Sequence, residues 1–176
     1  IASCLVGSEM CIRDRHNWFD SQQDLDQWGG DGFYFPIRAL QFLQQLYLPG
    51  TQSYWLYQHR QRVAFGQLCD RFDCNHLARL LVHPESRGQG HSKTLIKGLI
   101  AQGLQQNPQR DFSLFVYRKN LIAVQCYQQL GFIDAEQPGE SDPLLYFMKL
   151  NNKQARQLPV YYTHLRAHET RGNLVC

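Results

Sequence analysis

The stretch that decides the fold of this chain is Leu80-Leu81-Val82-His83-Pro84-Glu85-Ser86-Arg87-Gly88-Gln89-Gly90-His91-Ser92-Lys93-Thr94-Leu95. Its order predicts a buried strand, a turn marked by proline, a loop with two glycines and the start of an amphipathic helix. Gly88 and Gly90 let the backbone approach a ligand closely. The N–H groups of the loop, together with the free donors and the dipole of a helix N-terminus, favour an anion at this place. The stretch therefore predicts a site for a pyrophosphate group.

Spacing separates the phosphate-binding motifs that this loop resembles. Lys93-Thr94 is similar to the end of a P-loop, but that motif requires glycines where this chain has Arg87 and Ser92. A dinucleotide fingerprint requires a third glycine at Lys93. The pattern Arg/Gln-x-x-Gly-x-Gly/Ala, typical of the acetyl-CoA loop of the GCN5-related N-acetyltransferases, fits from Arg87 to Ser92 everywhere except at Ser92 itself. A helix-capping loop with no ligand is the remaining alternative.

Both ends of the chain are expected to be non-native tails. When Leu5–Asp14 is back-translated with freely chosen codons, the reverse complement encodes Val-Ser-Tyr-Thr-His-Leu-Arg-Ala-His-Glu. The segment 160–169 matches that peptide at every position except Tyr161, and such an inverted repeat resembles a sequencing adapter read in both directions. Residues 1–15 and 160–176 are therefore expected to be unpacked, and residues 16–159 to form one domain.

Composition narrows the class of protein. The formal net charge of the 176 residues is only +3 at pH 7, which gives no reason to expect a nucleic acid or a membrane as partner. Outside the two tails the cysteines are Cys69, Cys74 and Cys126, whose number and spacing fit neither a disulfide framework nor a zinc site. Apolar runs all fall short of a membrane span. We therefore expect a cytoplasmic protein with reduced thiols and no metal.

Hydrophobic periodicity predicts an α+β or mixed α/β fold. The expected order is a helix at 21–28, a helix after Pro36, strands at 53–58, 63–70 and 76–83 with a turn at Asn75, a helix from the glycine loop to Leu104, a strand at 112–117, a helix from Asn120 to Gly131, and strands from Phe132 and at 144–150. The third strand ends in three consecutive apolar residues, which is typical of a strand buried on both faces.

A second motif follows the glycine loop at the spacing of a helix and a strand. It is Asn120-x-x-Ala123-x-x-x-Tyr127-x-x-x-Gly131-Phe132, and it is similar, without a gap, to the other half of the N-acetyltransferase signature. The chain from about Trp28 to Leu150 thus resembles the GCN5-related N-acetyltransferase (GNAT) family. The resemblance implies a central, mixed, mostly antiparallel sheet flanked by helices. Its first strand would be missing or reduced to 16–19.

The resemblance also implies acetyl-CoA as co-substrate. The backbone of Leu81 and Val82 is expected to pair with the pantetheine arm, and Tyr127 to face the sulfur as the catalytic residue. N–H groups from Gly88 to Ser92 are expected to hold the pyrophosphate. The full set of implied cofactor-binding residues is Leu81, Val82, Arg87, Gly88, Gln89, Gly90, His91, Ser92 and Asn120.

Acyl transfer to an amine requires a neutral amine, a donor to the oxyanion and an acid for the leaving thiolate. Tyr127 suits the last role, although a tyrosine packed in the core is the alternative. The base is not identified: His76 titrates in the right range, but a strand histidine is more often structural. Cys126 precedes Tyr127 and is expected to point away from the sulfur, which argues against a nucleophile.

The sequence therefore predicts an N-acetyltransferase that acts by direct attack in a ternary complex. The acceptor is expected to be a small-molecule amine or a protein N-terminus, and the protein a monomer or homodimer. A non-catalytic acyl-CoA-binding sensor domain is the alternative from another class. An ATP-dependent enzyme that uses Lys93-Thr94 would need a metal-binding carboxylate, which the sequence does not reveal.

Overall fold

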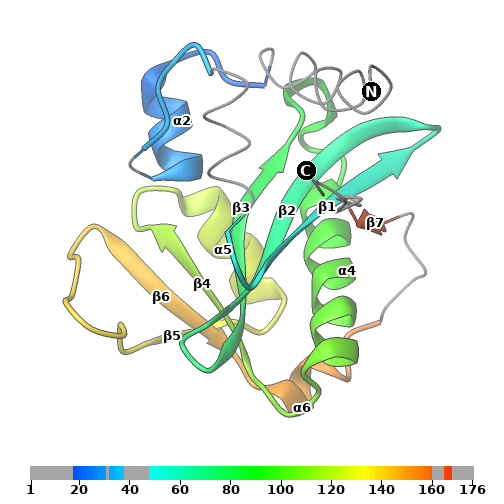
Figure 1. Ribbon diagram of the computed structural model, residues 1–176, viewed down its shortest axis with the longest axis vertical. Helices are drawn as coiled ribbons and strands as arrows, with labels where there is room; N and C mark the ends of the chain where they lie inside the picture. The colour runs from blue at the N-terminus through cyan, green and yellow to red at the C-terminus, as the bar shows by residue number, and fades with distance from the viewer. Residues whose placement is uncertain (1–17, 31, 38–47, 160–164, 168–176) are drawn as a thin grey trace, which may run out of the picture.

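A seven-stranded sheet is the centre of the computed structural model, which describes residues 18–30, 32–37, 48–159 and 165–167 (Figure 1). Its strand order is β5-β6-β4-β3-β2-β1-β7. The strands are β1 Thr51–Gln58, β2 Gln61–Arg71, β3 Cys74–Val82, β4 Phe112–Tyr117, β5 Ile133–Ala135, β6 Leu145–Leu150 and β7 Leu165–Ala167. All neighbouring strands are antiparallel except β3 and β4, which are parallel. The mixed, mostly antiparallel sheet expected from the sequence is confirmed.

Tight turns join the first three strands into a meander. His59 and Arg60, both with positive φ, turn the chain from β1 to β2. Phe72 and Asp73, again with positive φ, turn it from β2 to β3. The turn expected at Asn75 is therefore misplaced, because this residue lies within β3 and its side-chain amide donates to the carbonyl oxygens of Gly103 and Asn107.

The described helices are α2 Gln22–Gly29, the 3₁₀ turn η1 Pro84–Ser86, α4 His91–Gln106, α5 Leu121–Gln129 and α6 Asn152–Ala155. Side-chain caps explain where two of them begin: Ser21 accepts from the N–H of Asp24, and Asn120 accepts from the N–H of Ala123. The helix expected after Pro36 falls on residues 38–47, outside the described part of the chain. None of the described helices is long and apolar enough to span a membrane.

Two apolar cores lie on opposite faces of the meander. Successive residues of β1 alternate between them, since Tyr54 and Leu56 belong to one cluster and Trp55 to the other. The larger cluster includes the buried face of α4, with Leu95, Ile96, Leu99 and Ile100 as expected. The smaller one consists of Trp18, Phe19, Leu25, Phe33, Ile37, Trp55 and Phe65, so α2 and its flanking segments cover the second face.

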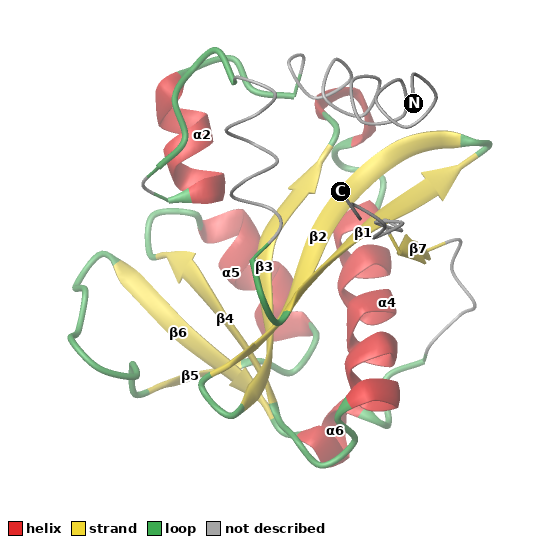
Figure 2. Cartoon of the chain, in the orientation of Figure 1, coloured by secondary structure: helices red, strands yellow, loops and turns green. Residues whose placement is uncertain are grey.

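The sheet opens where β3 and β4 diverge (Figure 2). The two strands pair only from Asn75 to Leu77, opposite Phe112 to Leu114. A register shift in the β2–β3 ladder lies just beyond, where Arg79 has a φ of +50°. Leu80, Leu81 and Val82 consequently line an opening and are only half-buried, so the expectation of burial on both faces is wrong. The end of β3 is only half-buried because β4 is no longer its neighbour there.

The outer edge of β1 is occupied by β7. Leu165–Ala167 pair with Tyr54–Leu56 in antiparallel register, so these three residues of the expected tail are paired rather than unpacked. An edge strand presents unpaired N–H and C=O groups, and any extended segment within reach can pair with them. Residues 1–17, 160–164 and 168–176 of the expected tails lie outside the described part. Of the expected reduced first strand, Trp18 and Phe19 are buried but form no strand.

Candidate functional site

A cavity of about 550 Å³ occupies the opening between the end of β3, the glycine loop and α5. Its walls contain many of the residues that the sequence predicted for the cofactor. The loop contributes Arg87, Gly88, Gly90, His91 and Ser92, and β3 contributes Leu80, Leu81 and Val82. Asn120 and Tyr127 close it from the side of α5. The structure therefore brings the two sequence motifs together around one space, which we call the cofactor cavity.

The loop geometry explains the two glycines. Gly88 has a φ of +76° and Gly90 a φ of +82°, values that favour glycine. A Cβ atom built on either residue would have no neighbouring atom within 4 Å. The space beside both glycines is therefore open, and Gly90 leads directly into the first turn of α4 as its N-cap. A side chain at either place would occupy the space that a ligand needs.

Free donors gather at this loop. The first N–H of α4 that donates to a preceding carbonyl is that of Thr94, which donates to Gly90 O at 3.2 Å. Among the described residues, no loop or cap carbonyl accepts from the N–H groups of residues 88–93. Nε2 of His91 is buried and also has no hydrogen-bond partner in the described part of the chain. A pyrophosphate would satisfy these groups, so the loop fits the corresponding part of acetyl-CoA.

The remaining loop residues brace the backbone. Arg87 Nε donates to Val82 O at 3.4 Å, and Gln89 Nε2 donates to Glu85 O at 3.2 Å. Both side chains thus stabilise the loop conformation through bonds to backbone carbonyls of the same segment. The predicted pairing of Leu81 and Val82 with a pantetheine arm is compatible with the fold, because β2 occupies one edge of these residues and β4 does not reach the other.

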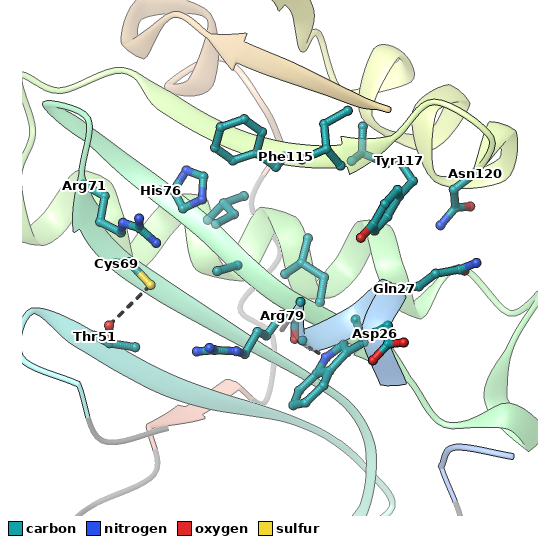
Figure 3. Close-up of a pocket in the computed structure, with 18 of the residues that line it drawn as sticks. Asp26, Gln27, Thr51, Cys69, Arg71, His76, Arg79, Phe115, Tyr117 and Asn120 are labelled. Carbon is teal, nitrogen blue, oxygen red and sulfur yellow. Dashed lines mark hydrogen bonds between the residues drawn. The ribbon is translucent and has the colours of Figure 1, made fainter. Parts of the chain in front are cut away.

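A second cavity, of about 620 Å³, also has Tyr127 in its wall. It shares Leu80, Asn120 and Tyr127 with the cofactor cavity, so these three residues mark the junction. Figure 3 shows its walls: Arg71, Cys69 and His76 lie at one end, Asp26, Gln27, Tyr117 and Asn120 at the other, and Arg79 between them. We call this space the acceptor cavity.

Tyr127 is half-buried at the junction. Burial, with a smaller contribution from neighbouring Cys126, raises the pKa of its phenol well above the ordinary value. The hydroxyl therefore remains protonated near neutral pH and can donate. Asn120 also faces both cavities, and its Oδ1 accepts from Ala123 N at 3.3 Å. This cap fixes the first turn of the helix that carries the tyrosine.

Cys126 lies in the same wall as Tyr127. It lines the cofactor cavity, and its Sγ lies 3.6 Å from Ser92 Oγ. Ile122, Ala123, Cys126 and Tyr127 all line this cavity, because residues three and four apart share one face of a helix. This stripe is broad enough to include both adjacent residues, and the expectation that Cys126 points away from the sulfur stays a prediction.

His76 lies in the wall of the acceptor cavity with only 4% of its surface exposed. Its Nδ1 lies 2.9 Å from Ser113 Oγ, and its ring packs edge-on against Phe72. Burial, together with the charge of Arg71, lowers the pKa of the imidazole to about 4. The ring is neutral near pH 7, and it would hold a proton taken from an ammonium only weakly.

The acceptor cavity was not predicted from the sequence. Of its distinctive residues, Asp26 lies on α2, far in sequence from Arg71 at the end of β2 and Arg79 on β3. Only Arg79 offers a signal: it is a charged residue inside a strand that is otherwise apolar near its end. Within the described ranges, no group of three or more His, Cys, Asp or Glu residues is arranged to hold a metal ion.

Comparisons with known proteins agree with this geometry. The sequence profile of the acetyltransferase (GNAT) domain matches residues 24–150. A spermidine N-acetyltransferase from Vibrio cholerae, solved with CoA and spermine, superimposes with a TM-score of 0.64 at 16% identity, over 82% of this chain and 92% of that one. A protein from Klebsiella pneumoniae named as a putative acyl-CoA N-acyltransferase gives a TM-score of 0.53 at 22% identity, over 63% and 83%. At such identities the likeness concerns the fold.

Proposed function

Because the chain belongs to the GNAT acetyltransferase family, we propose that it moves an acetyl group from acetyl-CoA to a primary amine by direct attack within a ternary complex. The observation that carries this proposal is the junction of the two cavities at Leu80, Asn120 and Tyr127. Two ligands can reach the same point from opposite sides, as a ternary complex requires. The Vibrio cholerae structure, which contains CoA and spermine, supports an amine as acceptor class.

The cofactor cavity holds the acetyl donor. N–H groups of residues 88–92 and the start of α4 bind the pyrophosphate, with His91 Nε2 as a further polar partner. The free edge of Leu81 and Val82 binds the amides of the pantetheine arm in the manner of an added strand. When bound, acetyl-CoA supplies a thioester whose carbonyl carbon accepts the amine nitrogen.

Tyr127 acts at the junction. The phenol is protonated at neutral pH, and its hydroxyl donates a hydrogen bond or a proton to the sulfur as the bond to the acetyl group breaks. The proton that the attacking nitrogen releases restores the phenol or leaves to solvent. Asn120 positions α5 through its cap. His76 receives no proton in this mechanism, because its pKa of about 4 makes the imidazole a poor base. Its bond with Ser113 gives it a structural role.

Release of free thiol tests the proposal. The protein is mixed with acetyl-CoA and a panel of amines, thiol release is followed by a chromogenic reagent, and the acetylated amine is identified by mass spectrometry. Amine-dependent release, with initial-rate lines that intersect when both substrates are varied, is the expected result. Tight CoA binding with no thiol released for any amine would favour the acyl-CoA sensor. Parallel lines would indicate an acyl-enzyme.

A further inference from the structure

The acceptor cavity carries an uneven charge. Arg71 and Arg79 contribute two cations to its wall, whereas Asp26 is the one carboxylate among the residues that line it in the described part of the chain. Burial is the main cause that lowers the pKa of both His76 and Arg79, and the charge of Arg71 lowers both further. The end of the cavity formed by β2 and β3 is therefore positive.

Arg71 is available to a ligand. It lies at the end of β2, where its guanidinium carbon is 4.8 Å from the ring centroid of Phe72. No Asp or Glu in the described ranges forms an ion pair with it. Arg79 is held more firmly, since its Nη1 donates to Gln67 Oε1 at 2.8 Å and its guanidinium lies over Phe33. One exposed and one fixed cation thus lie in the same wall.

The opposite end of the cavity differs in character. Figure 3 shows Asp26 at the same end of the cavity as Asn120 and Tyr117, with Arg71 at the other end. Asn120 belongs to the junction with the cofactor cavity, so this is the end at which an acceptor amine must lie. An acceptor that spans the cavity would meet a carboxylate and the junction at its amine end, and cations at its other end.

We propose that the acceptor is a small primary amine that carries a carboxylate, with the carboxylate bound by Arg71 and Arg79 and the amine placed at the junction beside Asn120. This inference rests on the proposed function, and it names the substrate class of the same site. Guanidinium groups bind carboxylates through two parallel hydrogen bonds, and they repel a second ammonium. The cavity thus favours an amino acid over an alkylamine or a diamine of the same length.

Binding and turnover are measured for matched ligands. Aminopropanoate, aminobutanoate and aminohexanoate are each compared with the alkylamine and the diamine of equal length. Calorimetry on the protein saturated with CoA gives their affinities without requiring turnover, and thiol release gives kcat/KM. We expect the best aminoalkanoate to bind at least about tenfold more tightly than its two partners, the scale of one charge-assisted contact. An aminoalkylphosphonate serves as a second anion.

Variants of Arg71 test whether this residue causes the preference for a carboxylate. Arg71→Gln should remove most of the preference for the aminoalkanoate, whereas Arg71→Glu should shift the preference toward the diamine. Arg60→Gln is the matched control, because Arg60 is an exposed arginine in the β1–β2 turn that lines neither cavity. A phosphonate preferred over every carboxylate would overturn the assignment of a carboxylate.

Equal affinities for the three ligand types, or a preference that survives in Arg71→Gln, would overturn the inference and leave the proposed function intact. If no amine is turned over, that result refutes the proposed function and does not refute the inference about the acceptor. In that case the affinities measured in the CoA complex still decide whether the cavity selects a carboxylate.

Discussion

Ser92 Oγ lies 3.6 Å from Cys126 Sγ and thereby joins the first turn of α4 to α5 across the cofactor cavity. The contact ties the two sequence motifs of the chain together. It also puts a thiol in the same wall as Tyr127. A cysteine beside a bound thioester raises the question of an acyl-enzyme, which the proposed direct transfer excludes.

Replacing Cys126 by alanine tests this point. We expect kcat of Cys126→Ala to remain within about threefold of the wild type, because a direct transfer needs no covalent intermediate and only a small packing contact is lost. Steady-state thiol release measures the rate, and the intact mass of the protein after incubation with acetyl-CoA alone shows whether it becomes acetylated. A loss of about a hundredfold or more, with an acetylated wild type, would establish the acyl-enzyme instead.

Gly90→Val should abolish CoA binding in a folded protein. The new side chain would extend into the open space beside the loop, where no neighbouring atom lies within 4 Å of the position that a Cβ would take. A φ of +82° adds strain of about 1–2 kcal/mol, which a stable domain tolerates. Calorimetry with CoA, together with the circular dichroism spectrum, separates loss of binding from loss of fold.

Gly139→Val is the control for that experiment. Gly139 has the same φ of +82° and the same empty surroundings, but it lies in an exposed loop away from both cavities. It should therefore reproduce the backbone strain and leave CoA affinity unchanged. Equal affinities for the two variants would remove the glycine loop from the proposed cofactor site.

Acid should destabilise the protein through His76. Burial lowers its pKa from 6.5 to about 4, so between these values the unfolded chain binds a proton that the folded chain does not. The stability that the neutral imidazole contributes is therefore complete above the pKa of the unfolded state. It is lost as the pH falls toward the pKa of the folded state. Between about pH 7 and about pH 5 the loss in the free energy of unfolding should be roughly 2 kcal/mol.

Urea denaturation at the two pH values measures this difference. His76→Gln should be less stable at neutral pH, because the bond with Ser113 changes, but its stability should depend less on pH. His59→Gln, in the exposed β1–β2 turn, should keep the dependence of the wild type. An unchanged pH dependence in His76→Gln would show that other groups cause the acid sensitivity.

Much of the fold was predictable because its signals are local. Ser21 and Asn120 cap the helices that they precede, and the strand at Phe112–Tyr117 has the bounds that its β-forming residues predict. The glycine loop was predictable for the same reason, since its backbone conformation depends on Gly88 and Gly90. These features depend on residues a few positions apart, which a single sequence displays directly.

The rest depends on contacts that the sequence does not display. The separation of β3 from β4 beyond Leu77 decides that Leu80–Val82 line a cavity, and no residue in that run encodes it. Arg71 and Asp26 share a cavity only because the sheet and α2 bring them to it. The pairing of Leu165–Ala167 with β1 likewise follows from an available edge.

Removal of residues 1–15 and 160–176 should leave the melting temperature within about 2 °C of the full chain. β7 contributes three residues to an edge, and Arg166 and Ala167 are exposed there, so little apolar surface returns to water. Differential scanning calorimetry of the two proteins makes the comparison. A drop of more than about 5 °C would show that these segments belong to the folded domain.

The most direct test of the proposed mechanism is the Tyr127→Phe variant, measured for both CoA affinity and turnover. Phenylalanine keeps the ring and its packing near Phe132 but removes the hydroxyl that we propose as donor to the sulfur. We expect CoA affinity to remain near that of the wild type. We expect kcat to fall by roughly 10²- to 10⁴-fold with little change in KM, because charge develops on the sulfur only in the transition state. Full activity in Tyr127→Phe would contradict the mechanism.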